Sequence, residues 1–544
     1  MKSRLLVSIA ALATFLAASA LTQINPVKAV PSDDPKPEYR TSDRCVACHN
    51  GLKTSTGEDI SIGLQWRASI MANSSRDPYW QGSVRRETID HPELTKDVED
   101  ECSTCHMSIT HLVARDAGRK SEVFAHLPIS AKKNSSSDAA DGVTCSVCHQ
   151  VEAAGLGTPE TYNGNVKVLF PKDINNRPEY GPFAPDAGHQ TVMRSSTEGF
   201  VPQQAPQIRN AALCGSCHTL YTKTRGKGGN VVGTFPEQMP YLEWLHSDYR
   251  TGKTCQACHM PEVTEVVPVT ALYGPGRVGM HRHEFVGSNF VMEAMLNDHR
   301  TDLGVQALPE ELHAATARTR AFLQTQSARI TIPSIQSTPQ GLAINVHVEN
   351  LTGHKLPTAY PSRRAWLHVV VTDTSGQTVF ESGALNPDGS IVGNDNDADP
   401  TRFEPHYSEI TKPDQVEIYE PILKDADGKV TTDLLDALAY AKDNRLLPTG
   451  FDKATATPDI AVVGEAAADP NFTDKGSLIR YVIDTSKAQG PFRVKVELWY
   501  QPIGFRWAHN LAPYKAAEPA RFVGYYESQA HDSAIILAHD EASN

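Results

Sequence analysis

The sequence predicts an α+β protein of two domains, because two different patterns occupy successive parts of the chain. Residues 45–259 contain five copies of Cys-x-x-Cys-His, separated by segments rich in Gly, Pro and Ser that predict short helices and long loops. After residue 328, apolar and polar residues alternate in several runs, such as Leu342 to Val348 and Val494 to Tyr500, which is typical of strands. We therefore expect a first domain of short helices and long loops, followed by an antiparallel β-sandwich-like domain.

The five motifs account for all ten cysteines of the 544-residue chain. They are Cys45-Cys48-His49, Cys102-Cys105-His106, Cys145-Cys148-His149, Cys214-Cys217-His218 and Cys255-Cys258-His259. Each copy has the spacing with which two thiols attach a haem through thioethers while the next imidazole becomes the proximal ligand of its iron. A disulfide framework gives no reason for a histidine after every second cysteine, and zinc requires four ligands per ion. The motifs therefore predict five covalently bound haem c groups in a multihaem cytochrome c domain.

Each iron needs a sixth ligand if all five are to be low-spin electron carriers. Five of the 21 histidines belong to the motifs, so the supply exceeds the need and a count cannot choose among the rest. Local sequence setting favours His111, His189, His246, His283 and His354, with His126 and His281 as further candidates. Met107 and Met260 are poorer candidates, because a side chain directly after a proximal histidine points poorly toward another iron.

The N-terminus has the features of a secretory signal peptide. Lys2 and Arg4 precede an apolar run over residues 5–21, and small residues offer cleavage sites after Ala20 or Ala29. An uncleaved anchor is the alternative, although the run is short for a membrane span. Because c-type haem is attached outside the cytoplasm, we expect an exported protein of the periplasm, the cell surface or the extracellular space, with no transmembrane span after cleavage.

The predicted boundaries are 1–29 for the signal peptide, 30–327 for the haem domain, 328–515 for the β domain and 516–544 for a C-terminal tail. A helix that begins at Pro309, with two acidic residues in its first turn, is expected to close the haem domain. In the β domain, Ser375-Gly376 predicts a hairpin turn. A long insertion at about 385–475 contains a predicted helix over Leu434–Lys442.

Charge and composition limit the partners. The formal net charge of -13 argues against nucleic acid, and an acidic surface could attract a basic redox protein. The segment Asp395-Asn396-Asp397-Ala398-Asp399 spaces oxygen ligands by two and is a weak calcium candidate. It lacks the later Gly and Glu of an EF-hand loop, so a solvated acidic loop is the alternative.

Three features together resemble a known group of proteins. With the five motifs, the segments Arg282-His283-Glu284-Phe285-Val286-Gly287 and Gly353-His354-Lys355-Leu356-Pro357 are similar to multihaem cytochromes c related to the tetrahaem carriers of nitrifying bacteria, particularly members with a C-terminal β domain. The resemblance implies electron transfer outside the cytoplasm through closely packed, mainly bis-histidine haems. Some relatives pass electrons to minerals or polymerise into filaments. No motif here reads Cys-x-x-Cys-Lys, which a nitrite-reducing pentahaem enzyme would require.

Three function classes remain open. The first is an electron carrier that serves redox partner proteins or an extracellular acceptor. The second is an oxidoreductase in which one open iron binds a small nitrogen or sulfur oxide, with Lys355, Arg363, Arg364 or a histidine supplying protons and charge. The third is a subunit of a homo-oligomer or filament, in which a histidine binds the haem of the next subunit. The surplus of histidines favours the electron carrier.

Overall fold

The computed structural model describes residues 39–544, apart from 131, 133–136, 169–172, 227 and 273. The predicted signal peptide lies outside the described residues and stays a prediction. Residues Glu38–Asn544 form one compact unit, so the predicted boundary at residue 328 separates two kinds of secondary structure within that unit. In the described part of the chain, no helix has the length and apolar character needed to cross a membrane.

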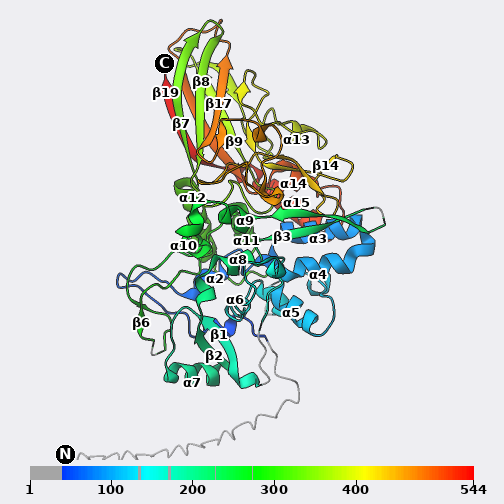
Figure 1. Cartoon of the computed structure of the whole chain (residues 1–544), viewed down its shortest axis with the longest axis vertical. Coiled ribbons are helices and arrows are strands. Elements are labelled where there is room, and N and C mark those ends of the chain that lie inside the picture. Colours follow the sequence, from blue (N-terminus) through cyan, green and yellow to red (C-terminus); the bar gives the residue numbers. More distant parts are fainter. Residues whose placement is uncertain (1–38, 131, 133–136, 169–172, 227, 273) are drawn as a thin grey trace, which may run out of the picture. The chain divides into compact units, whose positions relative to one another are not determined.

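Among the described residues before 328, the chain forms α-helices of 4 to 18 residues, long loops and three small sheets (Figure 1). These helices are α1 (Asp43–Val46), α2 (Ile62–Arg67), α3 (Pro78–Asp90), α4 (Thr95–His106), α5 (Ser108–Asp116), α6 (Cys145–His149), α7 (Ala187–Ser196), α8 (Ala211–Gly215), α9 (Pro240–Leu245), α10 (Cys255–His259), α11 (Phe290–Asp298) and α12 (Pro309–Gln326). The sheets pair β1 (Arg177–Gly181) with β2 (Phe200–Gln204), β3 (Leu220–Arg225) with β4 (Val231–Gln238), and β5 (Val267–Pro268) with β6 (Gly276–Arg277).

Two of these helices show how the local sequence sets their starts. Helix α12 begins at Pro309, as predicted, and the Glu311 carboxylate accepts a hydrogen bond from the Leu308 N–H at 2.9 Å. At the start of α3, the Asp77 carboxylate accepts from the N–H groups of Tyr79 and Trp80 at 2.8 and 3.0 Å. This cap fixes the residue at which α3 begins.

Two five-stranded sheets dominate the rest of the chain. One has the order β10-β9-β18-β19 with β12 beside β9, and the other has the order β11-β17-β8-β7 with β16 beside β17. Their strands are β7 (Ala328–Thr338), β8 (Gly341–Asn350), β9 (Arg364–Thr372), β10 (Thr378–Ser382), β11 (Glu409–Ile410), β12 (Ile418–Tyr419), β16 (Phe472–Thr473), β17 (Gly476–Ile483), β18 (Arg493–Gln501) and β19 (Ile535–Ser543). Within the two sheets, β11 runs parallel to β17 and the other pairs are antiparallel.

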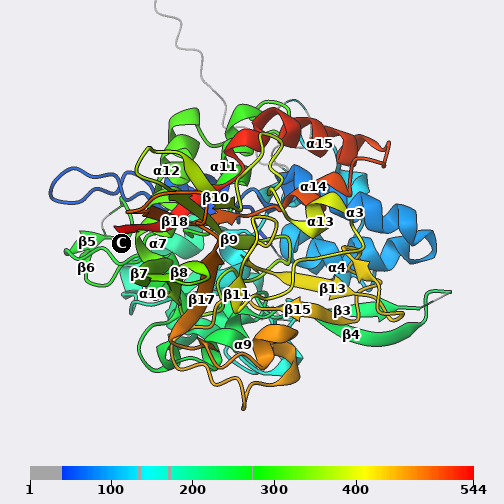
Figure 2. The same cartoon turned by 90° about the horizontal axis from the view of Figure 1, so that it is seen from above.

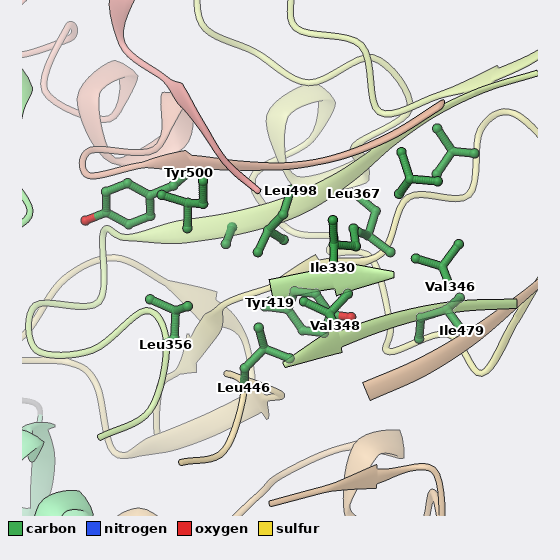
Figure 3. Close-up of a cluster of buried hydrophobic side chains, with 14 of the residues drawn as sticks. Ile330, Val346, Val348, Leu356, Leu367, Tyr419, Leu446, Ile479, Leu498 and Tyr500 are labelled. Atoms are coloured by element: carbon green, nitrogen blue, oxygen red, sulfur yellow. The ribbon is translucent and has the colours of Figure 1, made fainter. Parts of the chain in front are cut away.

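Both large sheets contribute to one buried hydrophobic cluster (Figure 3). Val346 and Ile479 come from one sheet, and Leu367 and Leu498 come from the other. All four are fully buried. Because side chains alternate between the faces of a strand, the period-two pattern in the sequence placed these residues on one face. The strands predicted from alternation are therefore confirmed, and the antiparallel β9–β10 pair confirms the hairpin at Ser375-Gly376.

The predicted helix over Leu434–Lys442 is wrong. Residues Ala439–Asp443 form strand β15 instead, which pairs with β13 (Pro421–Lys424), while β14 (Val430–Thr431) lies on the other side of β13. Before β15 the chain turns at Asp433, whose carboxylate accepts from the N–H groups of Leu435 and Asp436 at 3.0 and 3.1 Å. A partner strand and a turn-forming aspartate override the helical tendency of this segment.

The residues predicted to be a C-terminal tail are part of the folded structure. They form helix α15 (Ala517–Gln529) and strand β19. Helix α15 packs on α3, where the ring centroids of Tyr79 and Phe522 are 4.9 Å apart, and β19 pairs with β18. Strand β19 continues the sheet beyond residue 515 because Ile535 and Leu537 are buried with the core. The remaining helices are α13 (Asp395–Ala398) and α14 (Phe505–His509).

The hairpin of β3 and β4 lies beside the sheet of β13, β14 and β15 (Figure 2). The Arg225 N–H donates to the Leu435 carbonyl at 2.6 Å, and the Tyr440 hydroxyl donates to the Pro236 carbonyl at 2.6 Å. These bonds connect the motif-bearing part of the chain to the predicted insertion at about 385–475.

Candidate haem centres

The Cys-x-x-Cys-His motifs lie on or directly beside short helices (Figure 1). Helices α6 and α10 consist of a motif alone, α4 ends on His106, and Cys45 and Cys214 lie in α1 and α8. Residues three and four apart share one face of a helical turn, so the two cysteines and the histidine of a motif can reach the same group. The local conformation therefore suits attachment of a haem.

Cysteines of different motifs are close neighbours. Thiols lie within hydrogen-bonding reach in three pairs: Cys45 with Cys145, Cys105 with Cys217, and Cys214 with Cys255. Gly164, at a φ of 70°, is next to the second pair: a Cβ there would lie 3.6 Å from Cys105 Sγ and 3.8 Å from Cys217 Sγ. All ten cysteines are free of disulfides. The pairs join the first motif to the third, the second to the fourth and the fourth to the fifth, so groups attached at these motifs would be neighbours.

Four motif histidines are oriented through Nδ1. That atom lies at hydrogen-bonding distance from a backbone carbonyl in His49 (Val269, 2.6 Å), His106 (Ser74, 3.0 Å), His149 (Tyr180, 2.6 Å) and His259 (Val286, 2.6 Å). A carbonyl oxygen can only accept, so Nδ1 carries the proton and the lone pair resides on Nε2. This is the tautomer and the outer contact that metal-binding histidines use in proteins.

Two motif histidines face a second histidine at a distance that fits an iron between them. The ring centroids of His149 and His283 are 6.3 Å apart with 16° between the ring planes, and those of His259 and His354 are 6.3 Å apart with 13°. A metal–nitrogen bond of about 2 Å on each side, plus roughly 1.2 Å from each nitrogen to its ring centre, adds up to about the observed separation. The predicted ligands His283 and His354 are thus each opposite one motif histidine.

Both of these histidines are held in the neutral form that binds metals. Burial and the neighbouring His149 lower the pKa of His283 to about 3. Burial and the nearby His259 lower the pKa of His354 to about 4, although the hydrogen bond with the Lys355 carbonyl opposes this shift. At neutral pH no proton has to be removed before these nitrogens donate to a metal.

The loop between β8 and β9 holds His354 in place. The Asn350 side-chain amide and the Thr352 hydroxyl donate to the His354 carbonyl at 2.7 and 2.8 Å. The His354 Nδ1 lies 2.9 Å from the Lys355 carbonyl, which directs Nε2 the other way. Two local polar side chains therefore fix the backbone, and the backbone fixes the ring.

A buried charge network supports this loop. Lys355 Nζ lies 2.7 Å from Asp443 Oδ2, and Arg445 bridges the same carboxylate at 2.8 Å and Glu243 Oε1 at 3.0 Å. All four side chains are at most 4% exposed. Glu243 closes the network, because its other oxygen accepts from the Lys355 N–H at 3.1 Å and from the Thr358 hydroxyl at 2.5 Å. It connects helix α9, the His354 loop and strand β15.

The other predicted ligands are in different settings. His111 Nδ1 lies 3.3 Å from Asp100 Oδ1, and His189 Nδ1 lies 2.5 Å from Asp186 Oδ2. His246 Nε2 lies 3.0 Å from the Asp452 carbonyl. In ring contacts among the described residues, none of the three faces a motif histidine. Their roles as ligands stay predictions.

The remaining candidates are also described by the structure. His281 Nδ1 lies 2.5 Å from the Met260 carbonyl, His126 ends a short 3-10 helix, and the Met107 side chain is buried. None of these observations identifies an iron ligand.

Sequence reasoning missed Trp80, which stacks on a motif histidine. Its ring centroid lies 4.4 Å from that of His106, with 1° between the planes. Glu243, Asp443 and Arg445 were also missed, because each acts on the site from a distant element. No local motif marks any of these four residues, so sequence alone offered no signal for them.

Lys355 and Arg364, two of the residues predicted to supply protons and charge at an open iron, already have carboxylate partners. Lys355 is paired with Asp443, and both Nη atoms of Arg364 bind Asp397 at 2.7 and 2.9 Å. The Arg364 contact also engages the central carboxylate of the predicted calcium segment. The other two carboxylates there contact Arg402 and the Thr401 N–H. The three acids thus contact different protein groups, and calcium binding by this segment stays a prediction.

No protein-family model matches this chain, and no curated protein matches it. Among solved structures, the fold is similar to that of a penta-heme cytochrome c552 from Thermochromatium tepidum, with a TM-score of 0.51 over 94% of this chain and 100% of that chain. The two sequences are 15% identical, so the likeness is one of fold. The chain accordingly has the mixed α+β fold of a multihaem cytochrome c.

Proposed function

We propose that this protein is a pentahaem cytochrome c that carries electrons outside the cytoplasm through closely packed, mainly bis-histidine haems. The observation that carries the proposal is the pair of facing imidazoles, His149 with His283 and His259 with His354, each separated by the space that one six-coordinate iron occupies. The Cys-x-x-Cys-His motif at each first member supports covalent attachment of the same haem.

Haem supplies one-electron redox chemistry at its iron, and the protein supplies ligation, burial and spacing. In all four paired histidines Nδ1 lies at hydrogen-bonding distance from a backbone carbonyl, which leaves Nε2 as the nitrogen that can bind a metal. Burial keeps the imidazoles neutral. The neighbouring thiols of different motifs support short distances between successive groups, which is the arrangement that an electron carrier requires.

The setting of the protein is part of the same proposal. The predicted signal peptide supports export to the periplasm or the cell surface, and the net charge of -13 supports electrostatic attraction to a basic redox partner protein. An extracellular acceptor, and assembly into a homo-oligomer or filament, are the alternatives that the resemblance to surface cytochromes suggests.

Haem content and ligation test the proposal directly. Mass spectrometry of the denatured chain should find five haems, and low-temperature electron paramagnetic resonance should find low-spin iron. His354→Ala should convert one iron to the high-spin form without changing the haem count. An unchanged low-spin spectrum in that variant would contradict the assignment of His354, and fewer than five haems would contradict the count.

One observation favours a second candidate, an oxidoreductase with an open iron that acts on a small nitrogen or sulfur oxide. Burial, His259 and Arg363 together hold the pKa of His218 at about 4, so a cation lies near this histidine and could stabilise a bound anion. Carbon monoxide added to the reduced wild-type protein separates the candidates, since it binds an open iron and leaves six-coordinate irons unchanged.

A further inference from the structure

Three potential metal ligands meet away from the haem motifs, where helix α3 contacts the turn after β14. Glu87 and His91 lie four residues apart at the end of α3, and Asp433 lies in the predicted insertion at about 385–475. One carboxylate oxygen of each acid and a ring nitrogen of His91 all lie within 4.8 Å of one another. Glu87 and Asp433 are only 6% and 5% exposed.

The spacing of these atoms suits a small cation. His91 Nε2 lies 3.3 Å from Asp433 Oδ1, which is about the separation of two ligands in a tetrahedral site with bonds of roughly 2 Å. Glu87 lies in the last turn of α3, and His91 directly follows the helix, where its N–H donates to the Glu87 carbonyl at 2.9 Å.

The Glu87 carboxylate provides an independent observation. Its Oε1 accepts from the Leu434 N–H at 3.2 Å, whereas its Oε2 is buried and has no hydrogen-bond partner among the described residues. The Asp433 carboxyl lies within hydrogen-bonding reach of the Glu87 carboxyl. A buried oxygen without a donor, next to a second carboxylate, requires a proton or a cation.

The nearest fixed cation does not meet this need. The Arg86 guanidinium lies 3.4 Å from Asp433 Oδ2 and also 3.4 Å from Asp90, and it donates to the Thr432 carbonyl at 2.9 Å. Asp436 adds a further carboxylate 3.8 Å from His91 Nε2. The acids around the cluster therefore outnumber its guanidinium group.

We propose that Glu87, His91 and Asp433 bind one divalent transition-metal ion of the zinc type. An imidazole and two carboxylates form a ligand set that suits Zn²⁺, with water completing the coordination. The ion joins α3 to the turn at Asp433, two segments that are far apart in the chain. Because Trp80 of α3 stacks on His106, the ion also helps to hold the element that contacts the second motif.

The test uses the fully haem-loaded protein, in which the motif cysteines are occupied. The protein is stripped with a chelator, dialysed against Zn²⁺ and analysed for zinc per chain. We expect one bound zinc in the wild type and a loss of at least tenfold in affinity in Glu87→Gln, which keeps the shape of the side chain. Glu93→Gln is the matched control, since Glu93 is exposed and lies just beyond α3, and it should bind zinc like the wild type.

Two results of this binding assay would overturn the proposal. The first is a wild-type protein that takes up no zinc, in which case a proton satisfies the two carboxyls. The second is equal zinc binding by the wild type and Glu87→Gln. X-ray absorption at the zinc edge of the wild type gives a second readout that does not depend on a variant folding. The proposal expects nitrogen and oxygen neighbours, and a shell of sulfur would refute it.

Discussion

Removal of Asp443 gives a direct measure of the charge network behind His354. The Asp443 carboxylate contacts Lys355 Nζ at 2.7 Å and Arg445 at 2.8 Å, and all three side chains are almost fully buried. Asp443→Asn keeps the shape but leaves two buried cations with only Glu243 to balance them. Breaking one partner of a buried ion pair costs about 3–5 kcal/mol, so the free energy of unfolding should fall by about that amount.

Chemical denaturation followed by far-ultraviolet circular dichroism measures this change. The control is Glu349→Gln, which removes an exposed ion pair with Arg329 at 2.7 Å and should cost at most about 1 kcal/mol. Adding Lys355→Met to Asp443→Asn leaves one anion and one cation, and should recover part of the loss. A loss no larger than that of Glu349→Gln, or no recovery in the double variant, would refute the view that charge balance holds this network together.

Further outcomes follow from the same structure. His283→Ala should produce a high-spin iron signal, because the ring opposite His149 is lost, and identical low-spin spectra in this variant and the wild type would contradict the pairing of His149 with His283. His246→Ala should produce such a signal only if His246 is an iron ligand, as the sequence predicts. Leu498→Ala should lower the free energy of unfolding by about 2–5 kcal/mol, because the Leu498 side chain is fully buried in the core shared by the two sheets. The control Val392→Ala, at an exposed position, should change the free energy of unfolding by less than about 0.5 kcal/mol. Although burial opposes ionisation, Arg445 and Lys355 lower the pKa of Asp443 to about 2, so the contribution of Asp443 to stability is complete above the unfolded pKa of about 4 and is lost as the pH falls toward 2. Between these two pH values, the free energy of unfolding of Asp443→Asn should therefore fall less steeply than that of the wild type. Parallel plots of unfolding free energy against pH would contradict the assignment.

The sequence alone was sufficient where the determining interactions are local. A haem-attachment motif occupies five consecutive residues, so its chemistry can be read without knowing the fold. The alternation in β8 and β18 reports the burial of one strand face, and Pro309 with its acidic neighbours marks the start of α12. These features were predicted because each depends on residues a few positions apart.

Contacts between distant segments were decided by the tertiary structure. Segment Leu434–Lys442 became a turn and a strand because β13 offered a pairing partner, and residues 516–544 became a helix and a sheet strand because α3 and β18 offered surfaces. Local propensity is weak compared with such packing, so no local pattern could reveal either outcome.

The same distinction applies to the sites. The sequence named His283 and His354 as candidates among many histidines, but only the fold placed each one 6.3 Å from a motif histidine. It also brought Glu243 and Asp443 to the His354 loop, and Asp433 to the end of α3. Covalent haem attachment is encoded locally in the chain, whereas the opposite ligand and the charges that support it come from distant segments that only the packing of the whole chain brings together.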